Sequence, residues 1–245
     1  MQLSEASALV TGAAKRIGRK IAVSLAEKGV DVVIHYRTSE NEAIELRDEL
    51  RKLGVKSYLI QADLKKSTDL EDLVPRAKER VGRIDYLINN AAIFPRGRLD
   101  DLDFEELAEN IRLNSWAPFH LTRSFVNSVE QGKIINLLDT RVAGYDWTHA
   151  GYYLSKVLLT RMTKMTAINY APEFSVNGVA PGLIIPPEGE GEEYLEDRID
   201  RVPLKKYGSE VDVAQAVVYL LSSGFVTGQI LYVDGGRNLL HELEG

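Results

Sequence analysis

The sequence predicts an α/β protein in which one doubly wound sheet of seven parallel strands forms a single domain over residues 1–245. Three observations lead to this fold class. Seven short β-rich runs alternate with longer segments of helical pattern. Most of these runs are nearly continuous in apolar residues, as parallel strands buried on both faces are. A length of 245 residues with 44% hydrophobic content suits one compact domain.

The elements follow one another regularly along the chain. The predicted strands are residues 7–11, 31–35, 57–61, 85–89, 133–138, 174–180 and 229–234. Helices are predicted between them, and segments 41–52 and 156–170 are two examples, the second with apolar residues at helical spacing. Right-handed crossovers then place helices on both faces of the sheet. Residues 183–208 are rich in Pro, Gly and Glu, and we predict that they form a substrate lid.

Composition excludes several function classes. The net charge of −6 argues against nucleic acid or an anionic membrane as the main partner. The chain has no cysteine, which removes disulfides, zinc–thiolate sites and thiol nucleophiles, and we expect no metal site. The N-terminal residues do not form a signal peptide, and no apolar run is long enough to cross a bilayer. We therefore expect a cytoplasmic protein.

Residues 10–29, VTGAAKRIGRKIAVSLAEKG, have the pattern of a strand, a glycine turn and a helix. Gly12 permits the tight turn after the first strand, and Gly18 opens the helix, whose N-terminus offers free N–H groups to phosphate. An ordinary strand-to-helix turn could look the same, because a glycine pattern alone is weak evidence. In context it predicts a Rossmann-type phosphate site, with Arg16 standing between the glycines.

The tip of the second strand predicts which dinucleotide binds. Sites specific for NAD place an acidic residue there to hold the ribose 2′-hydroxyl. Here the tip reads His35, Tyr36, Arg37, Thr38 and Ser39, with no acid before residue 40. A guanidinium and two hydroxyls suit a 2′-phosphate instead, so we predict NADPH.

Tyr152 and Lys156 are four residues apart, so on a helix they share a face. A nearby ammonium lowers the pKa of a tyrosine and helps it to exchange a proton near neutral pH. Taken alone, the spacing also fits a surface helix pair. The pair follows the fifth strand, however, and Asn114 precedes it in an intervening helix.

At this point the sequence resembles the short-chain dehydrogenase/reductase family over essentially its whole length. The matching pieces, in order, are TGAAKRIG, ADL (62–64), NNAA (89–92), Asn114, YYLSK, NGVAPGLI (177–184) and VTGQILYVDGG (226–236). The resemblance implies that Tyr152 donates a proton, that Lys156 holds the nicotinamide ribose and tunes Tyr152, and that Asn114 anchors a water relay. Family members commonly pair their helices into homotetramers, which we expect here.

With the tip of the second strand, the resemblance defines a cofactor site. Its predicted members are Gly12, Arg16, Ile17, Gly18, His35, Tyr36, Arg37, Thr38, Ser39, Asp63, Leu64, Asn89, Asn90, Ala91, Tyr152, Lys156, Pro181, Gly182 and Ile184. Asp63 and Leu64 are expected at the adenine, Asn89 to Ala91 at the riboses, and Pro181 to Ile184 beside the nicotinamide.

Two positions depart from the common family pattern. Arg16 stands where a third glycine is usual, and Asp139 stands where a serine usually precedes the catalytic tyrosine by thirteen residues. An ionised carboxylate repels an oxyanion, but it accepts from N–H groups, and burial could make it a proton source. Asp139 therefore suits a substrate with ring nitrogens better than a simple ketone.

Together with Phe94, which follows NNAA, these departures resemble the pteridine reductase branch of the family. The resemblance implies that Arg16, Phe94, Asp139 and Tyr152 bind a pterin or dihydrofolate, with Phe94 stacking it on the nicotinamide. A carbonyl reductase acting on a 3-oxoacyl or polyol substrate is one alternative. A non-catalytic NADPH-binding regulator is another, since the fold permits it.

Overall fold

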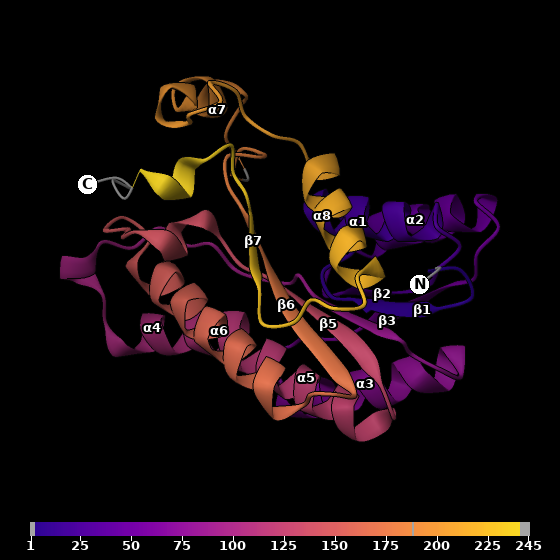
Figure 1. The fold of residues 1–245 in the computed structure, drawn as a ribbon. Coiled ribbons are helices and arrows are strands. Elements are labelled where there is room, and N and C mark those ends of the chain that lie inside the picture. The colour runs from indigo at the N-terminus through magenta and orange to yellow at the C-terminus, as the bar shows by residue number, and fades with distance from the viewer. Residues whose placement is uncertain (1–2, 188, 241–245) are drawn as a thin grey trace.

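Seven parallel strands form one sheet in the order β3-β2-β1-β4-β5-β6-β7 in the computed structural model, which describes residues 3–187 and 189–240 (Figure 1). The strands are β1 (Ser7–Val10), β2 (Asp31–Tyr36), β3 (Ser57–Gln61), β4 (Tyr86–Asn89), β5 (Gly132–Leu137), β6 (Phe174–Pro181) and β7 (Ile230–Val233). The predicted fold class is confirmed. The chain runs outward from β1 to β3 and returns to β4 on the other side of β1. A crevice therefore opens beyond the carboxyl ends of β1 and β4, where doubly wound sheets bind ligands.

Helices cover both faces of this sheet (Figure 1). They are α1 (Arg16–Ala26), α2 (Glu40–Lys52), α3 (Ser67–Val81), α4 (Phe104–Ile111), α5 (Ala117–Ser128), α6 (Ala150–Asn169), α7 (Glu193–Glu196) and α8 (Glu210–Ser222). Helix α1 packs against α2 and α8 on one face, whereas α3 packs against α5 and α4 against α6 on the other. Helix α6 begins six residues before the predicted 156, at Ala150, so that Tyr152 lies in its first turn. Among the described helices, none is long and apolar enough to span a membrane.

The hydrophobic core has two layers, one on each side of the sheet. Leu9 of β1 and its pairing partner Val33 of β2 belong to the layer under α3 and α5, with Leu73 and Phe125. The next residues along, Val10 and its partner Ile34, belong to the layer under α1 and α8. Alternation along each strand thus sends successive side chains to opposite layers, which is why the strand sequences are apolar throughout.

Residues 183–208 leave the sheet and form a separate lobe around α7 (Figure 1). Leu183, Leu195 and Val202 pack into a small buried cluster within it. Residue 188 lies outside the described residues. This cluster and the short helix give the segment a core of its own. That it acts as a lid stays a prediction.

Candidate active site

A cavity of about 580 Å³ lies at the carboxyl ends of the central strands, in the crevice beside β1 and β4. Most of the predicted site residues line it: Gly12, Arg16, Ile17, Gly18, His35, Tyr36, Arg37, Thr38, Ser39, Asp63, Leu64, Asn90, Ala91, Phe94, Asp139, Tyr152, Lys156, Pro181, Gly182 and Ile184. Asn89 and Asn114 are not among the residues that line it. The topology therefore brings together residues spread over more than two thirds of the chain.

The glycine turn after β1 is held in place by a buried histidine. Gly12 adopts φ +61°, a left-handed conformation that glycine tolerates best. Its N–H donates to Nδ1 of His35 at 3.0 Å, and Nε2 of His35 lies 3.1 Å from the carbonyl oxygen of Ala62. Burial lowers the pKa of His35 to about 4, so the ring is neutral at physiological pH and one ring nitrogen can accept. In the structure His35 fixes the turn; its predicted contact with the cofactor stays a prediction.

Arg16 occupies the position of the missing glycine with a left-handed backbone of its own, φ +54°. Its side chain reaches outward across the cavity, and Nη2 donates to the carbonyl oxygen of Pro186 at 2.5 Å. Gly18 is the residue that must be small, because a Cβ there would lie 2.3 Å from the Gly12 carbonyl oxygen and 2.5 Å from Nδ2 of Asn90. An arginine at 16 is tolerated because its side chain leaves the turn, whereas any side chain at 18 would collide with it.

One hydroxyl joins the two strands that border the crevice. Oγ1 of Thr11 accepts from the backbone N–H groups of Asn90 and Ala91 at 2.9 and 3.0 Å, and it lies 3.3 Å from the carbonyl oxygen of Ile88. The Asn90 side chain returns to the turn, donating to the carbonyl oxygens of Thr11 and Gly12.

Asn89, by contrast, points away from the cavity. It is buried, and its Nδ2 donates to Oδ1 of Asn136 on the adjacent strand β5 at 2.9 Å. The structure therefore does not place its side chain at the cofactor site. The reason is the strand alternation, because neighbouring residues of β4 and its extension face opposite sides.

The tip of β2 presents the predicted polar group to the cavity. Arg37 and Thr38 are exposed there, and Tyr36 to Ser39 contribute no carboxylate to the lining. Lys15 lines the same region and forms an ion pair with Glu42 at 2.6 Å. The side chains at this end of the cavity can thus meet an anion.

Tyr152, Lys156 and Asp139 converge at the other end. The Tyr152 hydroxyl donates to Oδ2 of Asp139 at 2.9 Å. Nζ of Lys156 donates to the Leu137 carbonyl oxygen at 2.7 Å. The sequence led us to expect a lowered pKa for Tyr152 beside Lys156, and the structure gives the opposite direction. Burial, with the charge of Asp139, raises the pKa of Tyr152 well above 10, while burial lowers the pKa of Lys156 to about 8.

Asn114 lies in a π-helical turn, residues Arg112–Trp116, between α4 and α5. Its Oδ1 accepts from the Ile93 N–H at 2.9 Å, and its Nδ2 donates to the Ile93 carbonyl oxygen at 3.1 Å and to Oγ of Ser155 at 3.0 Å. Asn114 therefore ties the chain after β4 to helix α6 and supports the segment that carries Phe94. Its part in a water relay stays a prediction.

Phe94 lies against Tyr152 at this end of the cavity. Its ring stacks on His149, with centroids 4.2 Å apart, and makes a T-shaped contact with Tyr152, with centroids 4.6 Å apart. The guanidinium carbon of Arg141 lies 5.0 Å from the same ring. His149, Tyr152 and Arg141 thus pack around the Phe94 ring, which also lines the cavity.

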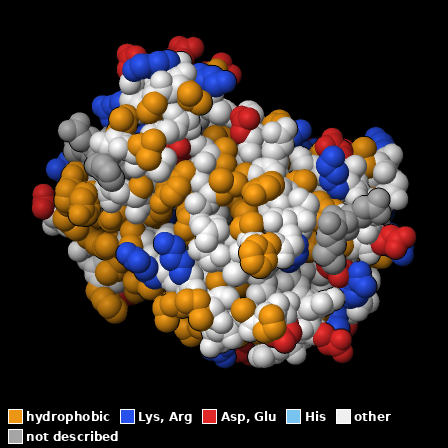
Figure 2. All heavy atoms as spheres, viewed as in Figure 1, with side chains coloured by type: hydrophobic (Ala, Val, Ile, Leu, Met, Phe, Trp, Pro, Cys, Tyr) orange, Lys and Arg blue, Asp and Glu red, His pale blue; other side chains and the backbone are white. Residues whose placement is uncertain are grey.

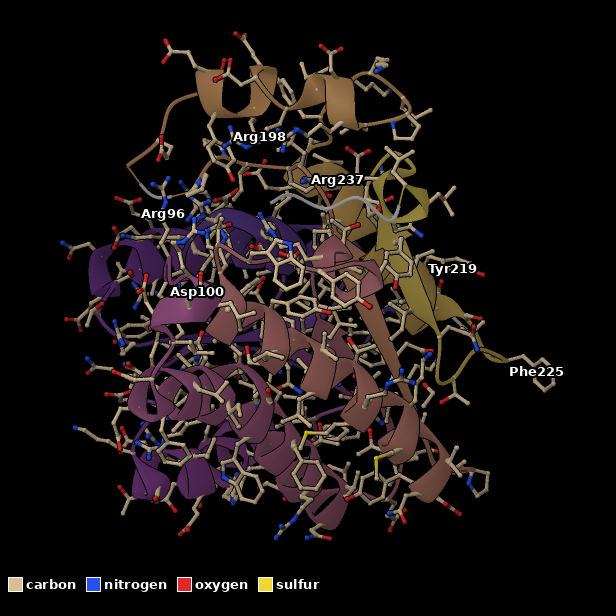
Figure 3. All side chains as sticks on the ribbon, turned by 90° about the vertical axis from the view of Figure 1, so that its left-hand side faces the viewer. Arg96, Asp100, Arg198, Tyr219, Phe225 and Arg237 are labelled. Carbon is tan, nitrogen blue, oxygen red and sulfur yellow. The ribbon has the colours of Figure 1, made fainter. Side chains whose placement is uncertain are left out.

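Sequence reasoning missed several residues of this end. Arg141, Tyr194 and the buried Arg237 also line the cavity, and Asp146 supports Arg141 from behind. Figure 3 shows Arg198 and Arg237 between the α7 lobe and the body of the molecule. Only Arg141 carried a usable signal, because it stands two residues after Asp139. The others come from distant segments whose approach the sequence does not reveal.

Comparisons with known proteins agree with this geometry. A family model described as enoyl-(acyl carrier protein) reductase matches residues 12–238. The 3-oxoacyl-[acyl-carrier-protein] reductase FabG of Staphylococcus epidermidis is 32% identical, covering 94% of this chain and 98% of the relative. Versicolorin reductase stcU of Emericella nidulans is 32% identical over 94% of each chain.

Among solved structures, FolM alternative dihydrofolate reductase 1 of Brucella suis, in complex with NADP, is 30% identical with a TM-score of 0.93. The match covers 100% of this chain and 98% of that one. The same protein from Brucella canis, also complexed with NADP, gives the same TM-score. The family match spans nearly the whole chain, and the relatives named above cover at least 94% of it. The chain therefore belongs to the short-chain dehydrogenase/reductase family of oxidoreductases.

Proposed function

We propose that the protein is an NADPH-dependent reductase of pterins, with dihydropterin, biopterin-like or dihydrofolate substrates. One observation carries the proposal: a carboxylate, Asp139, accepts the Tyr152 hydroxyl at the cavity, where family members that reduce ketones have a serine. The FolM structures of Brucella, named as alternative dihydrofolate reductases, support this substrate class.

The residues at the cavity fit NADPH. The Gly12 turn and the N-terminus of α1 border one end, where free backbone N–H groups suit a pyrophosphate. The absence of any side chain at Gly18 lets the helix approach the turn closely. Arg37, Thr38 and Ser39 would hold the 2′-phosphate, and Lys156 would hold the nicotinamide ribose.

When bound, the reduced nicotinamide supplies a hydride to a carbon of the pterin pyrazine ring, and the neighbouring nitrogen must gain a proton. Tyr152, whose hydroxyl hydrogen-bonds Asp139 at the cavity, would give that proton. Asp139 would take N–H groups of the ring as acceptor and share the proton of Tyr152. Phe94, which lines the cavity, would stack the flat ring, and Arg16 would meet its polar edge.

A carbonyl reductase of the same fold is the second candidate, because the FabG relatives reduce 3-oxoacyl groups by name. Against it, a carbonyl oxygen that becomes an oxyanion would face the Asp139 carboxylate and be repelled. A non-catalytic regulator is a third, but it has no use for Tyr152 and Lys156 held together in a buried site.

Oxidation of NADPH by a panel of substrates tests these alternatives. We expect dihydrobiopterin, dihydromonapterin or dihydrofolate to oxidise NADPH, and a 3-oxoacyl thioester to fail. The matched variant is Asp139→Ser, which should lose pterin reduction while weak ketone reduction persists or rises. If every pterin and folate fails while the ketone succeeds, the carbonyl reductase replaces the pterin reductase. If no substrate of the panel oxidises NADPH, the non-catalytic regulator replaces the pterin reductase.

We further propose a homotetramer. Hydrophobic side chains are spread over the face that carries α6, α8 and β7 (Figure 2). Met165 and Ile168 of α6 are 68% and 81% exposed, and Phe225 projects fully into solvent beyond α8 (Figure 3). Apolar area of this kind marks an interaction surface. Light scattering that gives the mass of four chains supports the proposal, and a monomer mass at micromolar concentration contradicts it.

A further inference from the structure

One guanidinium joins two carboxylates beside the cavity. The Arg141 side chain is only 13% exposed. Its Nη1 donates to Oδ2 of Asp139 at 3.0 Å, and its Nε lies 2.7 Å from Oδ2 of Asp146. Arginine keeps its charge in proteins, so a permanent cation is enclosed between the two acids.

Asp139 is held as a hydrogen-bond acceptor at both of its oxygens. Oδ1 accepts from the Arg141 backbone N–H at 2.8 Å. Oδ2 accepts from Nη1 of Arg141 and from the Tyr152 hydroxyl, at 3.0 and 2.9 Å. The three donors and the adjacent cation hold this carboxylate in place as the acceptor of the Tyr152 hydroxyl.

Asp146 holds Arg141 from the other side. Its Oδ1 accepts from the backbone N–H groups of Thr148 and His149, and its Oδ2 faces Nδ1 of His149 at 3.2 Å. Hydrogen bonds from His149 and Thr148 and the charge of Arg141 outweigh burial, and they lower the pKa of Asp146. Asp146 is therefore a fixed anion that competes with Asp139 for the same cation.

We propose that Arg141 is a positioning residue that holds the Asp139 carboxylate against Tyr152 and sets the pH at which the Tyr152–Asp139 pair takes up one further proton. That proton comes from water. Its use, the protonation of a substrate nitrogen through Tyr152, rests on the proposed function.

Other charged or titratable groups face the pair from every neighbouring element. Helix α6 contributes Lys156, which directs its ammonium to the Leu137 carbonyl oxygen. Asp234, after β7, accepts from the Thr140 hydroxyl, and Arg237 lines the cavity from the same segment. From α7, Tyr194 also lines the cavity. Arg141 hydrogen-bonds Asp139 directly, so its removal should change the protonation of the pair most.

The arrangement predicts opposite effects for the two neighbours of the pair. Arg141→Met fills similar volume but leaves Asp139 and Asp146 without their cation, so the protonation midpoint of Asp139 should rise by about one pH unit or more. Asp146→Asn removes the competing anion and leaves the charge of Arg141 to Asp139, so the midpoint should fall. Arg141→Lys keeps the charge and should stay near the native value.

Carbon-13 NMR of the aspartate carboxyl carbons measures these midpoints in the full-length protein without cofactor or substrate, with the Asp139 resonance identified by its loss in Asp139→Asn. A rise in Arg141→Met with a fall in Asp146→Asn supports the proposal. A common direction, or no movement in either, overturns it. If Arg141→Met does not fold, the variants Asp146→Asn and Arg141→Lys decide. A lower midpoint in Asp146→Asn together with a native midpoint in Arg141→Lys supports the role of Arg141. An unchanged midpoint in Asp146→Asn overturns it.

The pH profile of kcat is the second measurement, and it should move in the same directions as the NMR midpoints. A merely structural role would lower stability in these variants without moving the midpoints in opposite directions. If the native protein reduces no pterin while the NMR midpoints still move as predicted, the proposed function fails and the role of Arg141 stands.

Discussion

Acid should loosen the glycine turn through His35. Burial lowers the pKa of this ring from 6.5 to about 4. The ring is 2% exposed, and in its neutral form it accepts the Gly12 N–H. A lowered pKa means that the folded state disfavours the proton. The stabilisation is complete above the unfolded value of 6.5 and is lost as the pH falls toward 4. Between about pH 7.5 and about pH 4.5 the loss from this one group is about 2.5 kcal/mol.

The variant His35→Asn isolates this loss. Its side-chain oxygen can accept the Gly12 N–H, but the residue does not titrate. Urea unfolding followed by circular dichroism, at both pH values and for both proteins, gives the two free energies of unfolding. The native protein should lose about 2.5 kcal/mol more than the variant on acidification, because other carboxylates titrate alike in both. If the two proteins lose the same amount, the ring does not hold the turn in its neutral form and the reasoning is refuted.

Three further predictions address the cofactor and the proton. Tyr152→Phe removes the donated proton, so turnover should fall by about 100-fold or more. NADPH binding, followed by NADPH fluorescence, should survive. Unchanged turnover would assign the proton to another residue. Arg37→Asp should weaken NADPH binding by about tenfold or more and NADH binding far less. Titration calorimetry measures both affinities. Equal affinities of the native protein for the two cofactors would contradict the 2′-phosphate assignment. Gly18→Ala should cost about 1–3 kcal/mol of stability and most NADPH affinity, whereas Gly224→Ala, with open space at its Cβ, should cost neither.

The sequence predicted the fold because its strands are apolar on both faces, and such runs have few other uses. It also predicted most of the cavity, since the carboxyl ends of neighbouring strands must meet. The sequence could also have shown that the side chains of Asn89 and Asn90 have different surroundings, because adjacent residues of a strand point to opposite faces of the sheet. It could not give the pKa direction of Tyr152, which depends on burial and on Asp139 across 2.9 Å. Nor does the sequence around Arg237 indicate that this arginine is buried and lines the cavity.

The hydrogen bonds of the Thr11 hydroxyl stiffen one side of the crevice, and we expect the opposite side to adapt more easily to a ligand. By joining β1 to the chain after β4, this hydroxyl fixes the nucleotide end before any ligand arrives, so little conformational entropy remains to be lost there on binding. The opposite wall, from Ile185 to Pro187, is joined to the glycine turn through the Arg16 contact to Pro186, which an incoming ligand can replace. We therefore expect ordered kinetics, in which NADPH binds first to the stiffened side and the second ligand then sets the position of the other wall.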